Sequence, residues 1–332
     1  MKDMISTGAI KNIALVGISK NAGKTTVLNG VLRHYSDYQW GVFSTGIDGE
    51  TEDLVFKTPK PRVKLATGSI FCSEAEWLEL HGSEVSILHV NKYAGRRLYI
   101  ARAETEIETQ ITGPSALSDQ RKMISQMHKL GAQKVLVDGS LDRKSIALED
   151  NIDLLILAVG ASFGSASEII AELTRLLLLR DIPQQDLGSY EIRRLKQSAN
   201  LLYKRNGRWY DSSLASMIRK EKELLKILDT TPEALYIPGS LTDSVFTKLM
   251  GSLAKHPLKL IFRHPECLKL SLTNLQKLDK LCSLGCLIPF RLFAFALNAT
   301  SIGKDPVSAT DFRIQIRNAF PNEKFFDIME IQ

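Results

Sequence analysis

The sequence has few of the features that mark secreted, membrane-spanning or metal-rich proteins. Its 332 residues include only four cysteines and six histidines. No apolar run reaches the roughly 18 residues that a membrane-spanning helix needs, and the N-terminal segment lacks the apolar core of a secretion signal. A disulfide-rich secreted fold is excluded, and we expect a cytoplasmic protein that does not enter the membrane.

Metal-binding spacings are scarce among the cysteines and histidines. Cys282 and Cys286 form the only close cysteine pair, and no two histidines stand at the helical spacing of a ligand pair. A structural zinc site needs further cysteine or histidine at tight spacing, which does not follow here. We therefore expect four reduced thiols in buried or half-buried positions.

Charge of one sign does not dominate, but basic residues gather in one stretch. The chain carries 43 Lys and Arg against 37 Asp and Glu, a formal charge of +6. Aromatic residues lie among the basic residues between 193 and 226, a mixture that nucleic-acid binding would use. A solvated helix face or a protein-docking surface explains the mixture as well, and we weight nucleic acid as the less favoured partner. The residues concerned are Arg193, Arg194, Lys196, Tyr203, Lys204, Arg205, Arg208, Trp209, Tyr210, Arg219, Lys220 and Lys222.

Hydrophobic periodicity predicts an α/β fold with a mostly parallel sheet and helices on both faces. Short, nearly continuous apolar runs at 12–16, 40–44, 134–138 and 153–159 read as buried strands. Segments 25–34, 118–130 and 165–179 carry apolar residues at helical spacing. Strands that alternate with helices in this way are typical of parallel sheets covered on both sides.

The same patterns suggest three parts. Residues 1–182 are predicted to form a core with a β-rich insertion at 58–112, where turn residues separate short β-like runs. Residues 183–232 are more polar and have no strong strand, so we expect a helical insertion or linker. Residues 233–332 contain further strand-like runs at 234–238, 258–262 and 292–297. We expect this last part to complete the central sheet.

The most informative motif follows the first strand. Gly17, Ile18, Ser19, Lys20, Asn21, Ala22, Gly23, Lys24, Thr25 and Thr26 lead directly into a helix. Glycines at a strand-to-helix corner let backbone N–H groups close on phosphate oxygens, and the helix N-terminus favours an anion. Lys24 should reach the β and γ phosphates, the Thr25 hydroxyl should hold Mg²⁺ and Thr26 should touch the α phosphate. The pattern predicts a P-loop NTPase.

One detail departs from the commonest phosphate loop. Six residues separate Gly17 from Lys24, where the commonest pattern has five. The longer loop resembles that of dethiobiotin synthetase and its relatives among the P-loop NTPases. Lys20 could act like the additional lysine that some of that branch use to reach a neighbouring nucleotide, although a solvated Lys20 is favoured. The sequence leaves open whether the chain forms a homodimer.

Two acidic residues complete the predicted magnesium site. Asp138 ends the apolar strand 134–138, an arrangement that holds Mg²⁺ through a water or orients the attacking water. Asp48 follows the second strand, and strand ends of parallel sheets face the ligand crevice. Lys24, Asp48 and Asp138 are therefore the predicted catalytic residues, and Thr25, Asp48 and Asp138 the predicted metal ligands. Glu50 is a weaker candidate for activating water.

Base recognition favours adenine. The Asn/Thr-Lys-x-Asp motif with which GTPases read guanine has only two near matches, at 91–94 and 276–279, and each fails at one place. Asn298 follows the apolar run 292–297, where relatives of dethiobiotin synthetase place an asparagine against adenine. We expect ATP together with Mg²⁺.

Several segments in order resemble one family. These are residues 16–26, 46–50, 58–62, 113–115, 137–145 and 236–242. Together they resemble the P-loop subunit of the lysine 5,6-aminomutase reactivase, which accompanies adenosylcobalamin-dependent aminomutases. The likeness covers most of 10–180 and, more loosely, 234–328.

The resemblance implies an ATPase that opens an aminomutase, together with a companion reactivase subunit, so that damaged cofactor is exchanged. Arg143 and Lys144 could then sense the γ phosphate. Two alternatives stay open at this stage. One is an ATP-dependent ligase or kinase for a small molecule, resembling dethiobiotin synthetase. The other is a non-catalytic nucleotide sensor.

Overall fold

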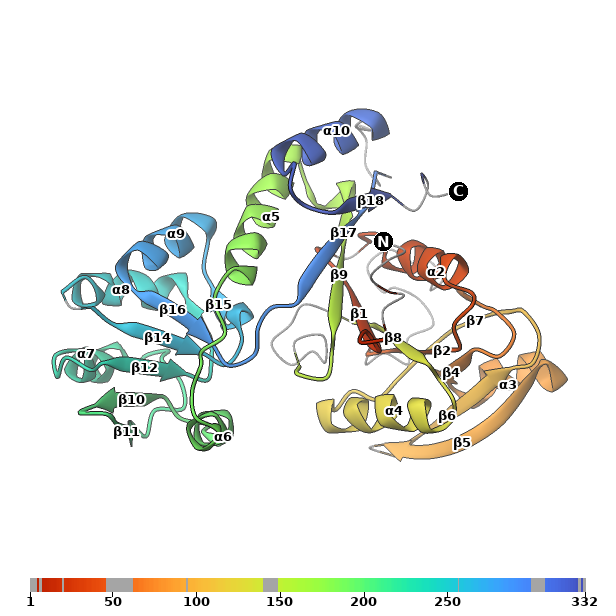
Figure 1. Ribbon diagram of the computed structural model, residues 1–332, viewed down its shortest axis with the longest axis horizontal. Helices are drawn as coiled ribbons and strands as arrows, with labels where there is room; N and C mark the ends of the chain where they lie inside the picture. The colour runs from red at the N-terminus through yellow and green to blue at the C-terminus, as the bar shows by residue number, and fades with distance from the viewer. Residues whose placement is uncertain are drawn as a thin grey trace. The chain divides into compact units, whose positions relative to one another are not determined.

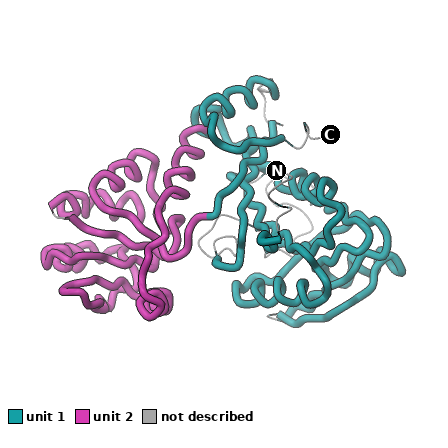
Figure 2. The backbone as a smooth tube through the Cα atoms, viewed as in Figure 1, with its two compact units in different colours: residues 1–169, 291–332 teal, residues 170–290 magenta. Residues whose placement is uncertain are grey.

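The chain folds into two compact units. The structure, a computed structural model, describes residues 5, 8–19, 21–45, 62–93, 95–139, 149–255, 257–299, 308–327 and 330. Unit 1 comprises residues 1–169 and 291–332, and unit 2 comprises residues 170–290 (Figure 2). The chain thus leaves unit 1 once, builds unit 2 and returns.

Unit 1 is built around a nine-stranded mixed sheet with the order β18-β17-β9-β1-β8-β2-β4-β6-β5 (Figure 1). The strands from β18 to β4 are parallel, and β6 and β5 pair antiparallel at one edge. The predicted α/β class and mostly parallel sheet are therefore confirmed. The strands are β1 (Asn12–Gly17), β2 (Trp40–Ser44), β4 (Ile70–Ser73), β5 (Val85–Tyr93), β6 (Arg96–Ala103), β8 (Lys134–Asp138), β9 (Leu154–Gly160), β17 (Leu292–Asn298) and β18 (Phe325–Asp327).

Helices cover both faces of this sheet. On one face α2 (Lys24–His34) packs Val27, Leu28 and Val31 into a core shared with β1 and β9. On the other face α4 (Leu117–Lys129) approaches β2, where a Cβ added at Gly41 would lie 3.1 Å from Met127. The central parallel strands are therefore sheltered from water on both sides, which is why β1, β8 and β9 are almost continuously apolar.

The remaining helices are short or lie at the ends of the unit. Among the described residues, no helix has both the length and the hydrophobicity that a membrane span requires. The longest helix among the described residues, α5, begins in unit 1 and ends in unit 2. The elements are α3 (Ala75–His81), α5 (Ala166–Arg180) and α10 (Ala309–Ala319).

The β-rich segment predicted at the sheet edge is present in the described part of 58–112. β4, β6 and β5 form that edge of the large sheet, and a small two-stranded sheet lies beside them. The small sheet pairs β3 (Val63–Leu65) with β7 (Ile107–Thr109) in antiparallel register. Residues 58–61 lie outside the described residues.

Unit 2 has its own sheet, with the order β11-β10-β12-β14-β16 (Figure 1). β12, β14 and β16 are parallel, and β10 and β11 form an antiparallel hairpin beside them. A separate parallel pair joins β13 to β15. The elements are α6 (Ser189–Gln197), β10 (Leu202–Arg205), β11 (Arg208–Asp211), α7 (Glu221–Leu228), β12 (Ala234–Ile237), β13 (Leu241–Thr242), α8 (Asp243–Leu253), β14 (Lys259–Phe262), β15 (Leu268–Lys269), α9 (Leu272–Leu281) and β16 (Ser283–Cys286).

Two sequence-based expectations differ from this arrangement. Residues 183–232 are not wholly helical, because β10 and β11 lie within them. The hairpin escapes periodicity analysis since its strands have four residues each and carry mainly polar or aromatic side chains. The segments at 234–238 and 258–262 are strands as predicted, but they belong to the second sheet. Among the described residues after unit 2, β17 and β18 join the central sheet, so the predicted boundaries at 182/183 and 232/233 do not coincide with the units.

Candidate functional site

Most of the predicted site residues stand on one edge of the large sheet. The carboxyl ends of the parallel strands β17, β9, β1, β8 and β2 are aligned there by their registers, and in parallel sheets this edge is where ligands bind. The aligned pairs are Asn298 with Gly160, Gly17 with Ala158, Leu15 with Asp138, and Asp138 with Ser44.

The chain turns sharply where β1 ends at Gly17. A Cβ added at Gly17 would lie 2.9 Å from the Ser19 carbonyl oxygen, so this corner is too tight for a side chain. The Ile18 N–H donates to the Ala158 carbonyl at 2.9 Å and ties the corner to β9. Asn21 has a φ of 60°, and its carbonyl accepts a hydrogen bond from the Ser162 hydroxyl at 3.3 Å. The corner is therefore fixed against the end of β9.

Gly23 and Asn298 are in direct contact. Gly23 has a φ of 88°, a left-handed conformation that glycine adopts without strain. A Cβ at this position would lie 2.4 Å from the Asn298 Nδ2. Ala22 is fully buried, and a Cβ on Gly160 would lie 2.7 Å from the Ala22 Cα. Ala22 and Gly23 thus pack tightly against the ends of β9 and β17.

Helix α2 begins at this edge. Its first residue is Lys24, its first turn contains no acidic residue, and its N-cap residue Gly23 has no side chain that could cap it. Lys24 and Thr25 are half-buried, whereas Thr26 is exposed. The N–H groups of the first turn, the positive end of the helix dipole and the Lys24 ammonium together favour an anion at this position.

Asp138 is the acidic group of the site. Its Oδ2 accepts a hydrogen bond from the Ser44 hydroxyl at 3.4 Å, and its Oδ1 is buried without a hydrogen-bond partner among the described residues. Burial raises the pKa of this carboxyl, and the positive charge of Lys24 and the Ser44 hydroxyl lower it only in part. An orphaned buried carboxylate oxygen facing an ammonium fits a water or a metal-bound water as its missing partner.

The structure brings together part of the predicted constellation. Gly17, Asn21, Ala22, Gly23, Lys24, Thr25, Thr26, Asp138 and Asn298 share the sheet edge. Lys20, Asp48, Glu50, Arg143 and Lys144 lie outside the described residues. Within the described ranges, no group of three His, Cys, Asp or Glu side chains gathers around one point. Thr25 and Asp138 are therefore the predicted metal ligands that can be placed.

Sequence reasoning did not assign three residues that the geometry adds to the site. Gly160 and Ser162 support the loop from β9, and Ser44 holds one oxygen of Asp138. Their signal in the sequence is weak, because each is only a small residue at or just beyond the end of an apolar run. Their role depends on strand order, which periodicity does not reveal.

Replacing Gly23 with alanine is expected to remove anion binding. Gly95 supplies a matched control, since its φ is 87° and no atom lies within 4 Å of its Cβ position. Gly95→Ala should cost only the left-handed strain, ~1–2 kcal/mol of unfolding free energy. Gly23→Ala adds the collision with Asn298, so we expect a larger loss in urea unfolding and no ATP binding by calorimetry. Equal stability losses with ATP binding intact would contradict the tight fit of the loop.

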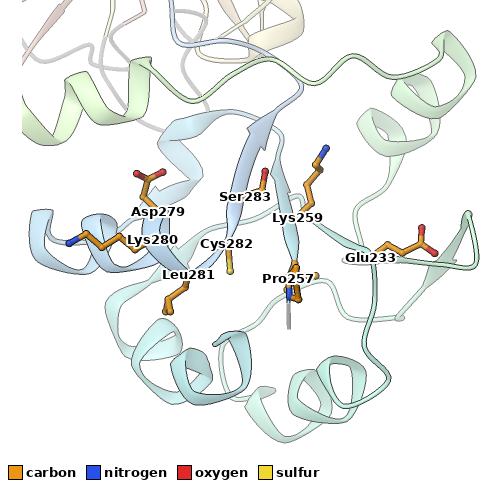
Figure 3. A pocket seen from close by; sticks show the side chains of 9 residues that line it. Glu233, Pro257, Lys259, Asp279, Lys280, Leu281, Cys282 and Ser283 are labelled. Carbon is orange, nitrogen blue, oxygen red and sulfur yellow. The ribbon is translucent and has the colours of Figure 1, made fainter. Parts of the chain in front are cut away.

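A surface hollow of about 550 Å³ lies in unit 2 and is unrelated to this edge (Figure 3). Lys259 and Ser283, the first residues of β14 and β16, line it, so it opens at the amino ends of these strands. Ligands of parallel sheets bind outside the carboxyl ends. None of the predicted site residues lines the hollow, and we assign it no role.

Known proteins offer no guide to this arrangement. Comparisons of the chain with protein-family models, with curated proteins and with solved structures found no match. The chemistry of the site has to be inferred from the residues that lie on it.

Proposed function

We propose that the chain is a P-loop NTPase that binds ATP with Mg²⁺ at the carboxyl edge of the large sheet. The observation that carries this proposal is an α2 N-terminus that begins at a left-handed glycine without an acidic first turn, on the same sheet edge as a buried carboxylate oxygen that has no hydrogen-bond partner among the described residues. The first favours phosphate, and the second favours a hydrated cation. Few ligands other than a metal-bound phosphate chain satisfy both.

Each placed residue has a distinct task in this proposal. The backbone N–H groups of the loop and of the first turn of α2 bind phosphate oxygens, and the Lys24 ammonium neutralises them. Thr25 and Asp138 would hold Mg²⁺, which neutralises charge that develops on the phosphates. Asp138 Oδ1, which has no partner among the described residues, would accept a hydrogen bond from a bound water, and the closely packed Gly160 and Ala22 hold the loop in place.

Asn298 is the residue through which we propose adenine selection. It ends β17 immediately beside Gly23, so its position is fixed relative to the phosphates. An amide side chain can both donate to and accept from a base edge. The lack of an intact guanine motif in the sequence also favours ATP over GTP.

At the level of the cell, we propose that ATP binding and hydrolysis drive the remodelling of an adenosylcobalamin-dependent aminomutase, with a companion subunit. The support is the resemblance of the ordered sequence segments to the lysine 5,6-aminomutase reactivase. Nucleotide-dependent loops adjoining the γ phosphate would bias a two-state docking surface.

A pull-down from source lysate tests the partner. The immobilised full-length chain should capture a cobalamin-dependent mutase in a manner that changes with ATP and Mg²⁺, and Lys24→Ala bait should lose that dependence. Adding ATP to the captured mutase should then release damaged cobalamin. The absorbance of the released cobalamin measures this step. Rapid ATP turnover with a small acid or amine in the absence of any protein partner would instead identify a ligase or kinase.

A further inference from the structure

The β10–β11 hairpin of unit 2 separates its side chains into two unlike faces. The strands pair Tyr203 with Tyr210 and Arg205 with Arg208, while Lys204 pairs with Trp209. Because side chains alternate along a strand, the two tyrosines and the two arginines lie on one face and Lys204 and Trp209 on the other. The sequence alone does not bring these residues together, since the segment reads as helical.

The inner face of the hairpin, which carries Lys204 and Trp209, makes its polar contacts within unit 2. The Glu191 carboxylate of α6 accepts hydrogen bonds from the Lys204 ammonium at 3.1 Å and from the Trp209 indole at 2.9 Å. These contacts lower the pKa of Glu191. Trp209 is buried in a core with Leu195 and Tyr236. This face is accounted for by folding.

The outer face of the hairpin, which carries the two tyrosines and the two arginines, lacks such ion pairs among the described residues. Arg205 and Arg208 are exposed, and neither forms an ion pair within the part of the chain that the structure describes. The rings of Tyr203 and Tyr210 stack with centroids 5.5 Å apart and an interplanar angle of 22°. Tyr210 is 41% exposed. Two arginines and two stacked tyrosines therefore form one surface, which we call the hairpin face.

The hairpin lies at the edge of its sheet, with β11 as the last strand (Figure 1). Nearby acidic groups are engaged: the Glu233 carboxylate accepts from the Gly207 N–H, and Asp211 accepts from the Asn200 amide and the Ser213 N–H. These carboxylates keep their charge, but neither forms an ion pair with Arg205 or Arg208 among the described residues, so both guanidinium groups are open to a phosphate.

We propose that the hairpin face binds a short stretch of single-stranded nucleic acid. Arginines supply charge for phosphates, and exposed aromatic rings on a sheet surface are platforms on which bases stack. An acidic peptide would satisfy the arginines but would leave the tyrosine rings without flat partners. The arrangement reverses the weighting that the sequence alone gave to nucleic acid. The site is independent of the proposed ATP site.

Fluorescence anisotropy with labelled eight-residue probes tests this inference. The probes are dT8, rU8, an abasic DNA 8-mer of the same charge, and an octaglutamate peptide. The protein is the full-length chain carrying Lys24→Ala, so that the phosphate loop does not contribute. We expect dT8 and rU8 to bind more tightly than the abasic 8-mer, because only bases can stack. A difference between dT8 and rU8 would separate DNA from RNA as the source of the strand.

Two sets of variants separate base stacking from phosphate binding. Tyr210→Ala should weaken dT8 binding about tenfold and leave abasic binding unchanged, while Tyr210→Phe should keep wild-type binding. The double variant Arg205→Ala, Arg208→Ala should reduce the slope of log affinity against log salt by about 1.4, because each of the two lost phosphate contacts contributes ~0.7. The controls are Tyr190→Ala, a more exposed tyrosine on α6, and Lys277→Ala with Lys280→Ala on α9.

The inference is overturned by several results. Equal affinities for dT8, the abasic 8-mer and octaglutamate would indicate unspecific charge attraction. Tighter binding of octaglutamate would assign the face to an acidic protein. No binding at 50 mM salt, or identical losses in the Lys277/Lys280 control, would leave the hairpin face without this role. Thermal unfolding of each variant excludes misfolding as the cause of a loss.

Discussion

Lys24→Ala is expected to abolish ATP binding by the full-length chain. Lys24 is the first residue of α2, and its positive charge partly offsets the rise that burial causes in the pKa of the Asp138 carboxyl. A charge-assisted contact contributes ~1.5–3 kcal/mol, and this ammonium is proposed to contact two phosphates. We therefore expect the affinity for ATP with Mg²⁺ to fall at least ~100-fold. Titration calorimetry measures the loss directly.

Arg33→Ala is the matched control for this experiment. Arg33 lies in the last turn of the same helix and is exposed, so its removal deletes one positive charge from α2 without touching the loop. ATP affinity should stay within about twofold of the wild type, because an exposed charge so far along the helix is screened by salt. Unchanged affinity in Lys24→Ala, or equal losses in both variants, would remove the basis of the proposed function.

The elements of the site could be predicted from the sequence because each has a strong local signal. The apolar run of β1, the glycines at 17 and 23 and the helical spacing of α2 follow one another without a gap. Asp138 ends an apolar strand, and a parallel sheet aligns strand ends at one edge. Local physics and global topology agree here, so the placed residues meet as expected.

Strand order and sheet membership could not be predicted in the same way. β12 is fully buried, just as β9 of the large sheet is, and no local property says which sheet it joins. The contact between Gly23 and Asn298 joins residues far apart in the chain and depends on β17 lying beside β9. The stacked pair Tyr203 and Tyr210 likewise exists only because two short polar strands form a hairpin.

Asp138→Asn is expected to stabilise the protein when nucleotide and metal are absent. The Asp138 carboxyl has a buried oxygen without a partner among the described residues, and burial raises its pKa above the ordinary value of 3.8. A raised carboxyl pKa means that the folded protein binds the proton more tightly than the unfolded chain does. The stabilisation that the protonated Asp138 carboxyl gives the folded state is therefore fully present below pH ~4. It is lost as the pH rises through the folded-state pKa of this group.

An asparagine carries no charge at any of these pH values, so the variant does not suffer that loss. In EDTA at pH 7.5 we expect Asp138→Asn to unfold at a higher temperature than the wild type. Its free energy of unfolding should be larger by ~1–3 kcal/mol. The difference should shrink as the pH is lowered toward 4. Asp153→Asn is the contrast, because the Asp153 Oδ2 already accepts from the Lys11 and Asn12 N–H groups and gains nothing from neutralisation.

The order of stabilities should invert when ATP and Mg²⁺ are added. A ligand at 100 times its dissociation constant stabilises the folded state by about 2.7 kcal/mol, and the wild type should gain this in full. Asp138→Asn should gain much less, since an amide holds a hydrated cation poorly, and its ATP hydrolysis should fall at least ~100-fold. Thermal unfolding of both proteins in EDTA and in saturating ATP with Mg²⁺ shows whether the curves cross. A variant that is less stable than the wild type in EDTA would mean that Asp138 is a structural carboxylate, whereas equal gains from ATP would remove it from the metal site.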